Sequence, residues 1–239
     1  AFLLLGVLGL GYPAVFLWTL MPGLVAVGCL VFLVKERART TVARVSFRDG
    51  LRQLPPRYRR FLVAVGIFGA GDFAHTLLIL LATQKLTPQL GPLGAGSAAV
   101  GLYVAHNVFY AGFAFLAGWL ADRVNKVRLL AVGYGLAAVM ALGIIVLPLG
   151  LWTLAAVFVA GGIYVAIEET LEDSLCAELV PTEQHGMAFG VLATVNGVGD
   201  FLSSVIVGAL WSACGVATAF GYSAVLFAVG SFLVLRVSK

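Results

Sequence analysis

Two ionisable residues, Asp72 and His75, lie three positions apart inside an otherwise apolar stretch of the chain. On a helix, this spacing places both side chains on the same face. Two later apolar stretches each carry a comparable pair, His106 with Asn107 and Asn196 with Asp200. A carboxyl group with an imidazole nearby can take up, share and release a proton.

A second concentration of charge comprises four acidic residues within six positions: Glu168, Glu169, Glu172 and Asp173. Three basic residues precede them in the chain: Arg123, Lys126 and Arg128. Because opposite charges form strong hydrogen-bonded pairs, we expect Glu172 or Asp173 to pair with this basic group. The alternative is a set of interfacial charges at a helix end. Glu168 should lie deepest of the four and face a cavity.

The sequence lacks the motifs of enzymes that act through a nucleophile, a phosphate loop or a bound metal. No HExxH, GxSxG or phosphate-loop pattern occurs, and no Cys and His residues have metal-site spacing. Cys29, Cys176 and Cys214 are isolated in or beside apolar segments. We therefore expect no catalytic residues, no metal and no cofactor, with a proton as the coupling ion.

Helices that cross a lipid bilayer must position these polar residues. Hydrophobic residues make up 61% of the 239 residues and charged residues 11%, whereas ordinary soluble domains are about 25% charged. Apolar runs of about 20 residues can cross the ~30 Å hydrocarbon core as helices. The sequence therefore predicts an all-α, polytopic transmembrane bundle with the lipid bilayer as its solvent.

About seven spans are expected. Residues 1–34 would form too long a helix for one crossing, so we place a break at Gly11, Tyr12 and Pro13. The spans then cover residues 14–34, 61–83, 96–120, 127–147, 151–179, 184–210 and 216–234. Residues 1–34 would end one bundle, residues 35–60 would form a basic connector, and residues 61–239 would form a six-helix bundle.

The basic residues gather in a few loops. Of the 15 Lys and Arg residues, most lie in residues 35–60, in residues 123–128 and at the C-terminus. This pattern follows the positive-inside bias, places these segments and the C-terminus in the cytoplasm, and disfavours a nucleic-acid-binding face. Lys85 is the exception. Within the connector, Ser46 could cap a short surface helix carrying Phe47, Leu51 and Leu54, and a solvated linker is the alternative.

The polar residues at mid-membrane depth allow three interpretations. A charge there costs at least about 2.5–3.5 kcal/mol on insertion scales, so each one requires a partner or a function. Asp72 or Asp200 could exchange a proton with a water-accessible cavity, with His75 as a relay. The same groups could instead pair across helices and fix their packing, or they could contact a substrate directly.

Residues 118–128, GWLADRVNKVR, resemble the G-x-L-x-D-R-x-G-R-R/K signature of the major facilitator superfamily. Five residues match in kind: Gly118, Leu120, Asp122, Arg123 and Lys126. Asn125 replaces the usual glycine, and Arg128 lies one residue beyond the last basic position of the signature. Residues 16–36, 68–84 and 164–190 are also similar to bacterial members, although His185 stands where members often have arginine.

The resemblance implies twelve helices in a complete protein, of which this chain holds the end of the fifth, the sixth and the second half. It implies that residues 61–83 and 151–179 line a central cavity. It also implies that Asp122 and Arg123 belong to a cytoplasmic charge relay with Glu172 or Asp173. A missing N-terminal bundle would complete the site.

The function implied is secondary transport of a small solute across a bacterial cytoplasmic membrane by alternating access, coupled to protons. A scaffold or receptor of the same fold, or an uncoupled facilitator, remains the alternative. No Arg or Lys lies at mid-membrane depth, which disfavours a dianionic substrate.

Overall fold

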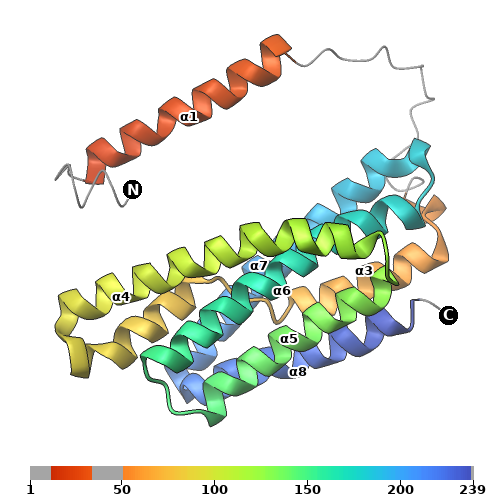
Figure 1. Ribbon diagram of the computed structural model, residues 1–239. Coiled ribbons are helices and arrows are strands. Elements are labelled where there is room, and N and C mark those ends of the chain that lie inside the picture. Colours follow the sequence, from red (N-terminus) through yellow and green to blue (C-terminus); the bar gives the residue numbers. More distant parts are fainter. Residues whose placement is uncertain (1–11, 34–50, 238–239) are drawn as a thin grey trace. The chain divides into compact units, whose positions relative to one another are not determined.

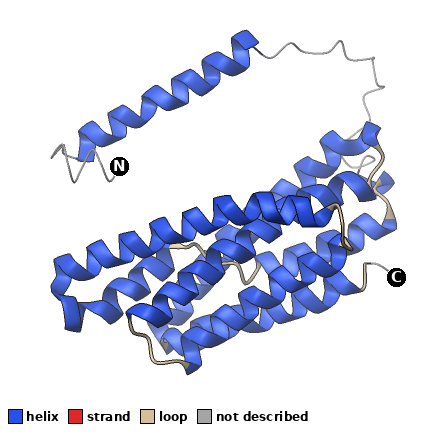
Figure 2. Ribbon diagram, viewed as in Figure 1, coloured by secondary structure: helices blue, strands red, loops and turns tan. Residues whose placement is uncertain are grey.

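The computed structural model describes residues 12–33 and 51–237 of the chain. Residues 1–45 and residues 46–239 form two compact units, and each is described by itself. Figure 2 shows helices joined by short turns, with no strand in the described residues. The prediction of an all-α protein is therefore confirmed.

The first unit contributes one helix, α1 (Tyr12–Leu33), which continues through Pro22. Its large side chains are exposed along much of its length, as at Trp18 and Leu24. Gly11, the first residue of the predicted break, lies outside the described part of the chain. The predicted cap at Ser46 and its neighbour Phe47 lie outside it as well. Residues 51–53 are helical, and Leu54 is buried in the core of the second unit.

The second unit is a bundle whose helices run alongside one another (Figure 1). Its elements are α3 (Pro56–Gly69), α4 (Thr76–Ala121), α5 (Lys126–Val146), α6 (Leu151–Leu179), the short 3-10 helix η2 (Thr182–Gln184), α7 (His185–Cys214) and α8 (Val216–Leu235). Helix α4 packs mainly on α6, α5 packs on α8 and α6, and α3 packs on α8 and α7.

The predicted span over residues 61–83 is not one continuous helix, and this expectation was wrong. Helix α3 ends at Gly69, the chain is irregular over Asp72, Phe73 and Ala74, and α4 begins at Thr76. Two glycines, one on each side of Ala70, weaken the helix here because they lack the side chains that stabilise it. Asp72 and His75 therefore lie on the irregular backbone between α3 and α4 and not on one face of a continuous helix.

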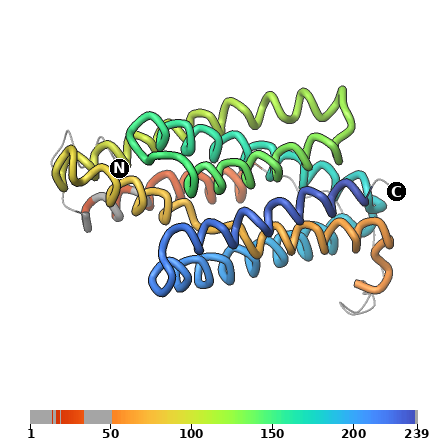
Figure 3. The backbone as a smooth tube through the Cα atoms, turned by 90° about the horizontal axis from the view of Figure 1, so that it is seen from below, coloured from red at the N-terminus to blue at the C-terminus, as the bar shows by residue number. Residues whose placement is uncertain are grey.

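Helix α4 reverses direction near its middle, as the yellow-to-green ribbon shows in Figures 1 and 3. The reversal lies at Gly91, whose φ of 68° and ψ of 170° are not helical. Glycine adopts a positive φ without the steric cost that a Cβ atom would bring. Helix α4 thus contains both the end of one predicted span and the whole of the next.

Five helices in the described residues are long and apolar enough to cross a bilayer. They are α4, α5, α6, η2 together with α7, and α8. The count is two lower than the expected seven. The span that was predicted over residues 61–83 is divided between α3 and α4, and the span predicted over residues 14–34 is represented in this count only by the shorter apolar segment Leu20–Leu33. The chain is a multi-pass membrane protein.

The turns alternate between the two ends of the bundle. Figure 1 places the start of α3, residues 122–125, residues 180–184 and the end of α8 at one end. The reversal within α4, the turn between α5 and α6 and the turn between α7 and α8 lie at the other end. The loops that were assigned to one side of the membrane by counting spans therefore share one end.

An aromatic cluster links Phe68 of α3 to one ring of α5 and one ring of α8. The Phe68 ring stacks on Tyr134 with 3.7 Å between centroids and lies 4.7 Å from Phe227. Apolar side chains such as Val132, Val139 and Phe201 point outwards and are exposed. Such an outer surface suits lipid, because hydrocarbon solvates apolar groups without cost.

Candidate functional site

Backbone atoms at the break between α3 and α4 lose their helical partners, and hydroxyl groups from α7 and α8 replace them. The Tyr222 hydroxyl donates to the Ala70 carbonyl at 2.9 Å, the Ser203 hydroxyl donates to the Asp72 carbonyl, and the Ala74 N–H donates to Ser204 Oγ at 3.1 Å. Irregular backbone at membrane depth is tolerated where it is buried in protein or lines a water-filled cavity. In this break Gly71 and Phe73 are buried in protein, and residues 72–75 line a cavity.

A cavity of about 450 Å³ lies beside the break. Its polar lining comes from the break, α4, α6 and α7, and its ionisable and amide members are Asp72, His75, Glu168, Glu169, Asn196 and Asp200. Each of these except Glu169 was named from the sequence as a candidate for the cavity. The structure brings them together although they are up to 128 positions apart in the chain.

Asp72 and Glu169 are each held by a tyrosine. The Tyr164 hydroxyl of α6 donates to Asp72 Oδ1 at 3.0 Å. The Tyr110 hydroxyl of α4 donates to Glu169 Oε2. Both tyrosines orient a carboxyl group at the cavity wall, and neither was anticipated from the sequence.

Glu168 differs from its neighbours. Its exposed fraction is 9%, and it lines the cavity. No described residue forms a hydrogen bond or an ion pair with its carboxyl group, whereas Asp72 and Glu169 each accept one. An ionised carboxylate that is largely buried is stabilised only by a partner, and the cavity is the side from which a proton, water or a cation can reach this one.

The two histidines meet at the edge of the cavity. The rings of His75 and His106 lie 4.5 Å apart between centroids, and His106 Nδ1 lies 3.1 Å from the Phe158 carbonyl oxygen. His75 Nε2 is buried without a hydrogen-bond partner among the described residues. His106 itself is buried behind the cavity wall.

Asn107 takes no part in this cluster. Its side chain is exposed, and its Nδ2 donates to the Tyr103 carbonyl of the preceding helical turn at 2.7 Å. Adjacent helical positions point in directions about 100° apart, and here the ring of His106 packs against His75 while Asn107 is exposed. The sequence interpretation placed both residues in one polar layer.

Glu172 was expected to form an ion pair in a charge relay, and the structure gives it different partners. It is 1% exposed, accepts a hydrogen bond from the Tyr134 hydroxyl, and accepts another from Asn196 Nδ2 at 2.7 Å. Its carboxyl group is therefore part of the buried polar network of α5, α6 and α7. The four-residue spacing that separates it from Glu168 places both on the same face of α6.

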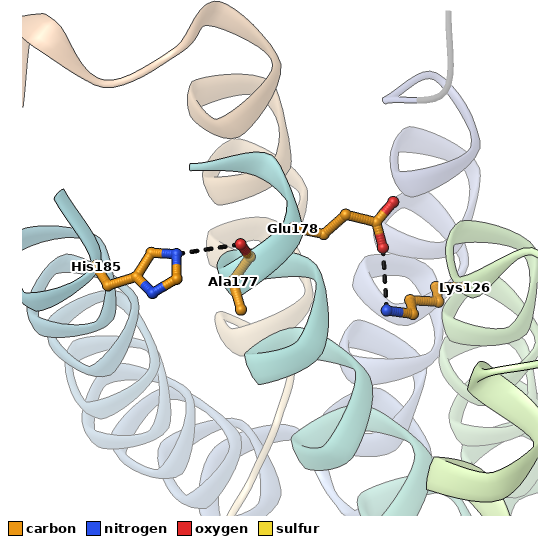
Figure 4. Close-up of polar contacts among 4 residues, drawn as sticks. All are labelled: Lys126, Ala177, Glu178 and His185. Carbon is orange, nitrogen blue, oxygen red and sulfur yellow. Dashed lines mark hydrogen bonds and ion pairs between the residues drawn. The ribbon is translucent and has the colours of Figure 1, made fainter. Parts of the chain in front are cut away.

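The ion pair with the basic turn is made by Glu178, which the sequence interpretation did not select. Lys126 Nζ lies 3.0 Å from Glu178 Oε2 (Figure 4). Asn125, the departure from the family signature, caps α5 by accepting the Arg128 N–H at 3.0 Å. Glu178 follows Glu172 in the chain and lies next to the last residue of α6, where this helix comes close to the start of α5.

The remaining residues of the predicted relay are at the same end of the bundle. Arg123 donates to the Trp119 carbonyl at 2.9 Å, and its guanidinium lies 3.9 Å from the centre of the Trp119 ring. Asp122, Arg128 and Asp173 are exposed. Gly118 faces α6, where an added Cβ would lie 3.8 Å from Thr170.

His185 closes the end of α6. Its Nε2 lies 3.2 Å from the Ala177 carbonyl oxygen, a contact drawn in Figure 4, and 3.0 Å from that of Val180. These carbonyls have lost their helical donors, and an imidazole N–H can satisfy them. A histidine thus makes a helix-end contact at the position where arginine is usual in the family.

Within the described residues, no group of three or more His, Cys, Asp and Glu side chains is arranged to hold a metal ion. The cavity carboxyl groups are spread around its wall and do not converge on one point. The arrangement can therefore bind protons, water or a larger solute with several polar contacts.

Comparison with known proteins agrees with this architecture. The model of the Major Facilitator Superfamily matches residues 1–204 and, in a second match, residues 69–239. A protein of Methanocaldococcus jannaschii with the name "Uncharacterized MFS-type transporter" is 27% identical over 207 residues, which cover 87% of this chain and 51% of that protein. The chain thus spans about half the length of the curated relative that it matches. It belongs to the major facilitator superfamily.

Proposed function

We propose that the complete protein is a secondary transporter that moves a small solute by alternating access and couples this movement to protons. The observation that carries the proposal is the position of Asp72, on irregular backbone at the wall of a cavity that it shares with three other acidic residues. Discontinuous helices that line a cavity near the bilayer midplane are typical of secondary transporters.

The carboxyl groups support proton coupling through their mutual repulsion. Asp72, Glu168, Glu169 and Asp200 surround one cavity, with no Lys or Arg among its lining residues. Like charges in a medium of low dielectric constant repel strongly, so a proton on one of them stabilises the group. His75, which faces the same cavity, could pass that proton between Asp72 and the solvent.

The direct test uses the full-length protein in proteoliposomes with an imposed pH gradient and a panel of radiolabelled solutes. Wild-type flux should change several-fold with the gradient, and flux in Asp72→Asn and Asp200→Asn should not respond to it. Glu183→Gln, which removes an exposed charge from η2 outside the cavity, serves as the control. Wild-type coupling in both Asp variants would refute the proton assignment.

The same measurement distinguishes the alternatives. Flux that ignores the gradient in the wild type would indicate an uncoupled facilitator. No flux of any solute would indicate a scaffold or receptor with the same fold.

We also propose that the end of the bundle that carries residues 122–125 faces the cytoplasm, with the basic connector. The basic residues of that turn support this orientation through the positive-inside bias. A cysteine introduced at Val124, which is exposed, should react with a membrane-impermeant maleimide in inverted vesicles and not in intact cells.

A further inference from the structure

The cavity beside the α3–α4 break has the chemistry of a binding site for a positively charged solute. Four acidic side chains line it and no Lys or Arg does, in a volume of about 450 Å³. This volume lies within the range of about 300–1,000 Å³ that is usual for small-molecule sites. A negatively charged solute would be repelled by these four carboxylates, and no Lys or Arg lines the cavity to offset the repulsion.

Glu168 identifies the point at which the positive charge would sit. Its carboxyl group is nine-tenths buried, lines the cavity and has no hydrogen-bond donor among the described residues. The other buried carboxyl group of α6, Glu172, already accepts hydrogen bonds from Tyr134 and Asn196. Only Glu168 therefore combines burial, access to the cavity and unused acceptor capacity within the described chain.

The shape of the acidic lining favours an organic cation over a metal ion. No three metal-ligating side chains converge in the described residues. A divalent metal needs several ligands at short distance, whereas an ammonium group needs one carboxylate and a few acceptors. Aromatic side chains are also present, since Phe73 and Tyr103 line the same cavity. They can pack against the apolar part of a solute or face its charge.

We propose that the solute is a protonated amine with an apolar or aromatic body, and that its ammonium group pairs with Glu168 while Asp200 contributes a second acceptor. This proposal rests on the proposed transport function and names the substrate class for its cavity. Because Glu168 lacks a donor, the amine should supply one through an N–H bond, and a quaternary ammonium should bind less well.

The test is isothermal titration calorimetry on the purified full-length protein in detergent, with four probes. Two are protonated amines, 2-phenylethylamine and 1,5-diaminopentane. The third, 3-phenylpropionate, carries a carboxylate on the same phenylethyl group in place of the ammonium and so has the opposite charge. The fourth, phenethyltrimethylammonium, keeps the charge and loses the N–H donors.

At least one protonated amine should bind, and 3-phenylpropionate should not. Glu168→Gln should weaken amine binding by about thirtyfold or more, because it removes one partner of a buried charge pair. Glu168→Asp, which keeps the charge, should retain part of the affinity, and Glu183→Gln should bind as the wild type does. Asp200→Asn, at an exposed position of α7, should weaken binding even if the Glu168 variants prove unstable.

Equal amine affinity in Glu168→Gln and wild type would overturn the proposal, as would binding of 3-phenylpropionate or no amine binding at all. Failure of the transport function is distinguishable from these results. Amine binding without flux would leave the site in place and refute transport, whereas proton-coupled flux of other solutes without amine binding would refute the substrate class alone.

Discussion

The hydroxyl group of Ser203 satisfies a carbonyl group that the broken helix leaves without a partner. The side chain is completely buried, and its Oγ donates to the Asp72 carbonyl oxygen. Removal of such a donor strands a polar atom in an apolar surrounding. Ser212 lies on the same helix and is exposed, and its hydroxyl donates to the Gly208 carbonyl within that helix.

Ser203→Ala should therefore lower the free energy of unfolding by about 1–2 kcal/mol. The same substitution at Ser212 should change it by less than about 0.5 kcal/mol, as is usual at exposed positions. Reversible unfolding of the full-length protein in mixed micelles, with increasing fractions of dodecyl sulfate, measures both. Equal effects of the two substitutions would show that the Ser203 hydrogen bond does not stabilise the break.

At the scale of single residues, the sequence identified the acids of the cavity and missed the groups that hold them. Asp72, Glu168 and Asp200 stand out because charges are rare in apolar runs. Tyr164 and Ser203 do not, since tyrosine and serine are common in membrane helices and only the packing shows what they contact. Glu172 was one of two acids expected to pair with the basic group, and its depth along α6 could not show that Tyr134 and Asn196 lie opposite it.

At the scale of helices, close approach of α4 and α6 depends on Gly162. A Cβ atom added at this position would overlap the carbonyl oxygen of His106. Backbone atoms cannot move aside as a flexible side chain can, so the helices would have to separate. Small residues at membrane helix contacts permit this kind of approach.

Gly162→Ala should lower stability by about 1–3 kcal/mol, which is the usual cost of overpacking. Gly208→Ala on α7 provides the control, because apart from the adjacent backbone of α7 no atom of the described residues lies within 4 Å of the added atom. The midpoint of thermal unfolding in detergent reports both effects. A Gly162→Ala protein as stable as Gly208→Ala would mean that α4 and α6 can separate without cost.

The ion pair of Lys126 with Glu178 joins the start of α5 to the end of α6. With the side chains 24% and 59% exposed, its contribution to stability should stay below about 1 kcal/mol. Lys126→Glu should nevertheless reduce solute flux, because two acids would then face each other at the turn. The double variant Lys126→Glu with Glu178→Lys exchanges the two charges and should restore the flux. If the flux of the double variant stays low, the ion pair is not what the transport requires.

The helices themselves were largely predictable, and their interruptions were not. The predicted spans over residues 127–147 and 151–179 agree closely with α5 and α6, since long apolar runs end at polar turns. The predicted span over residues 61–83 also has the length and hydropathy of one helix. Its sequence Gly69-Ala70-Gly71-Asp72 contains the signal of the break, but apolar periodicity continues across it and conceals the change.

At the scale of the whole molecule, the chain covers about half the length of its relative from M. jannaschii. We expect the cavity to be completed by an N-terminal bundle, as transporters of this family rock one bundle against the other. Expression of this chain alone should give no flux in proteoliposomes. Co-expression with the N-terminal half of the same protein should restore flux, and transport by this chain alone would contradict the expectation.

The break between α3 and α4 also has a mechanical consequence. Helix α3 packs mainly on α7 and α8, whereas α4 packs mainly on α6, so the break connects two helices with different main neighbours. A small rotation between the two helices would change backbone dihedral angles mainly at residues 70–75 and leave the helices themselves unbent. Amide deuterium uptake that changes on solute binding at these residues more than in the middle of α6 would reveal such a joint. The carboxyl group of Asp72 would then move with the hinge on which it sits.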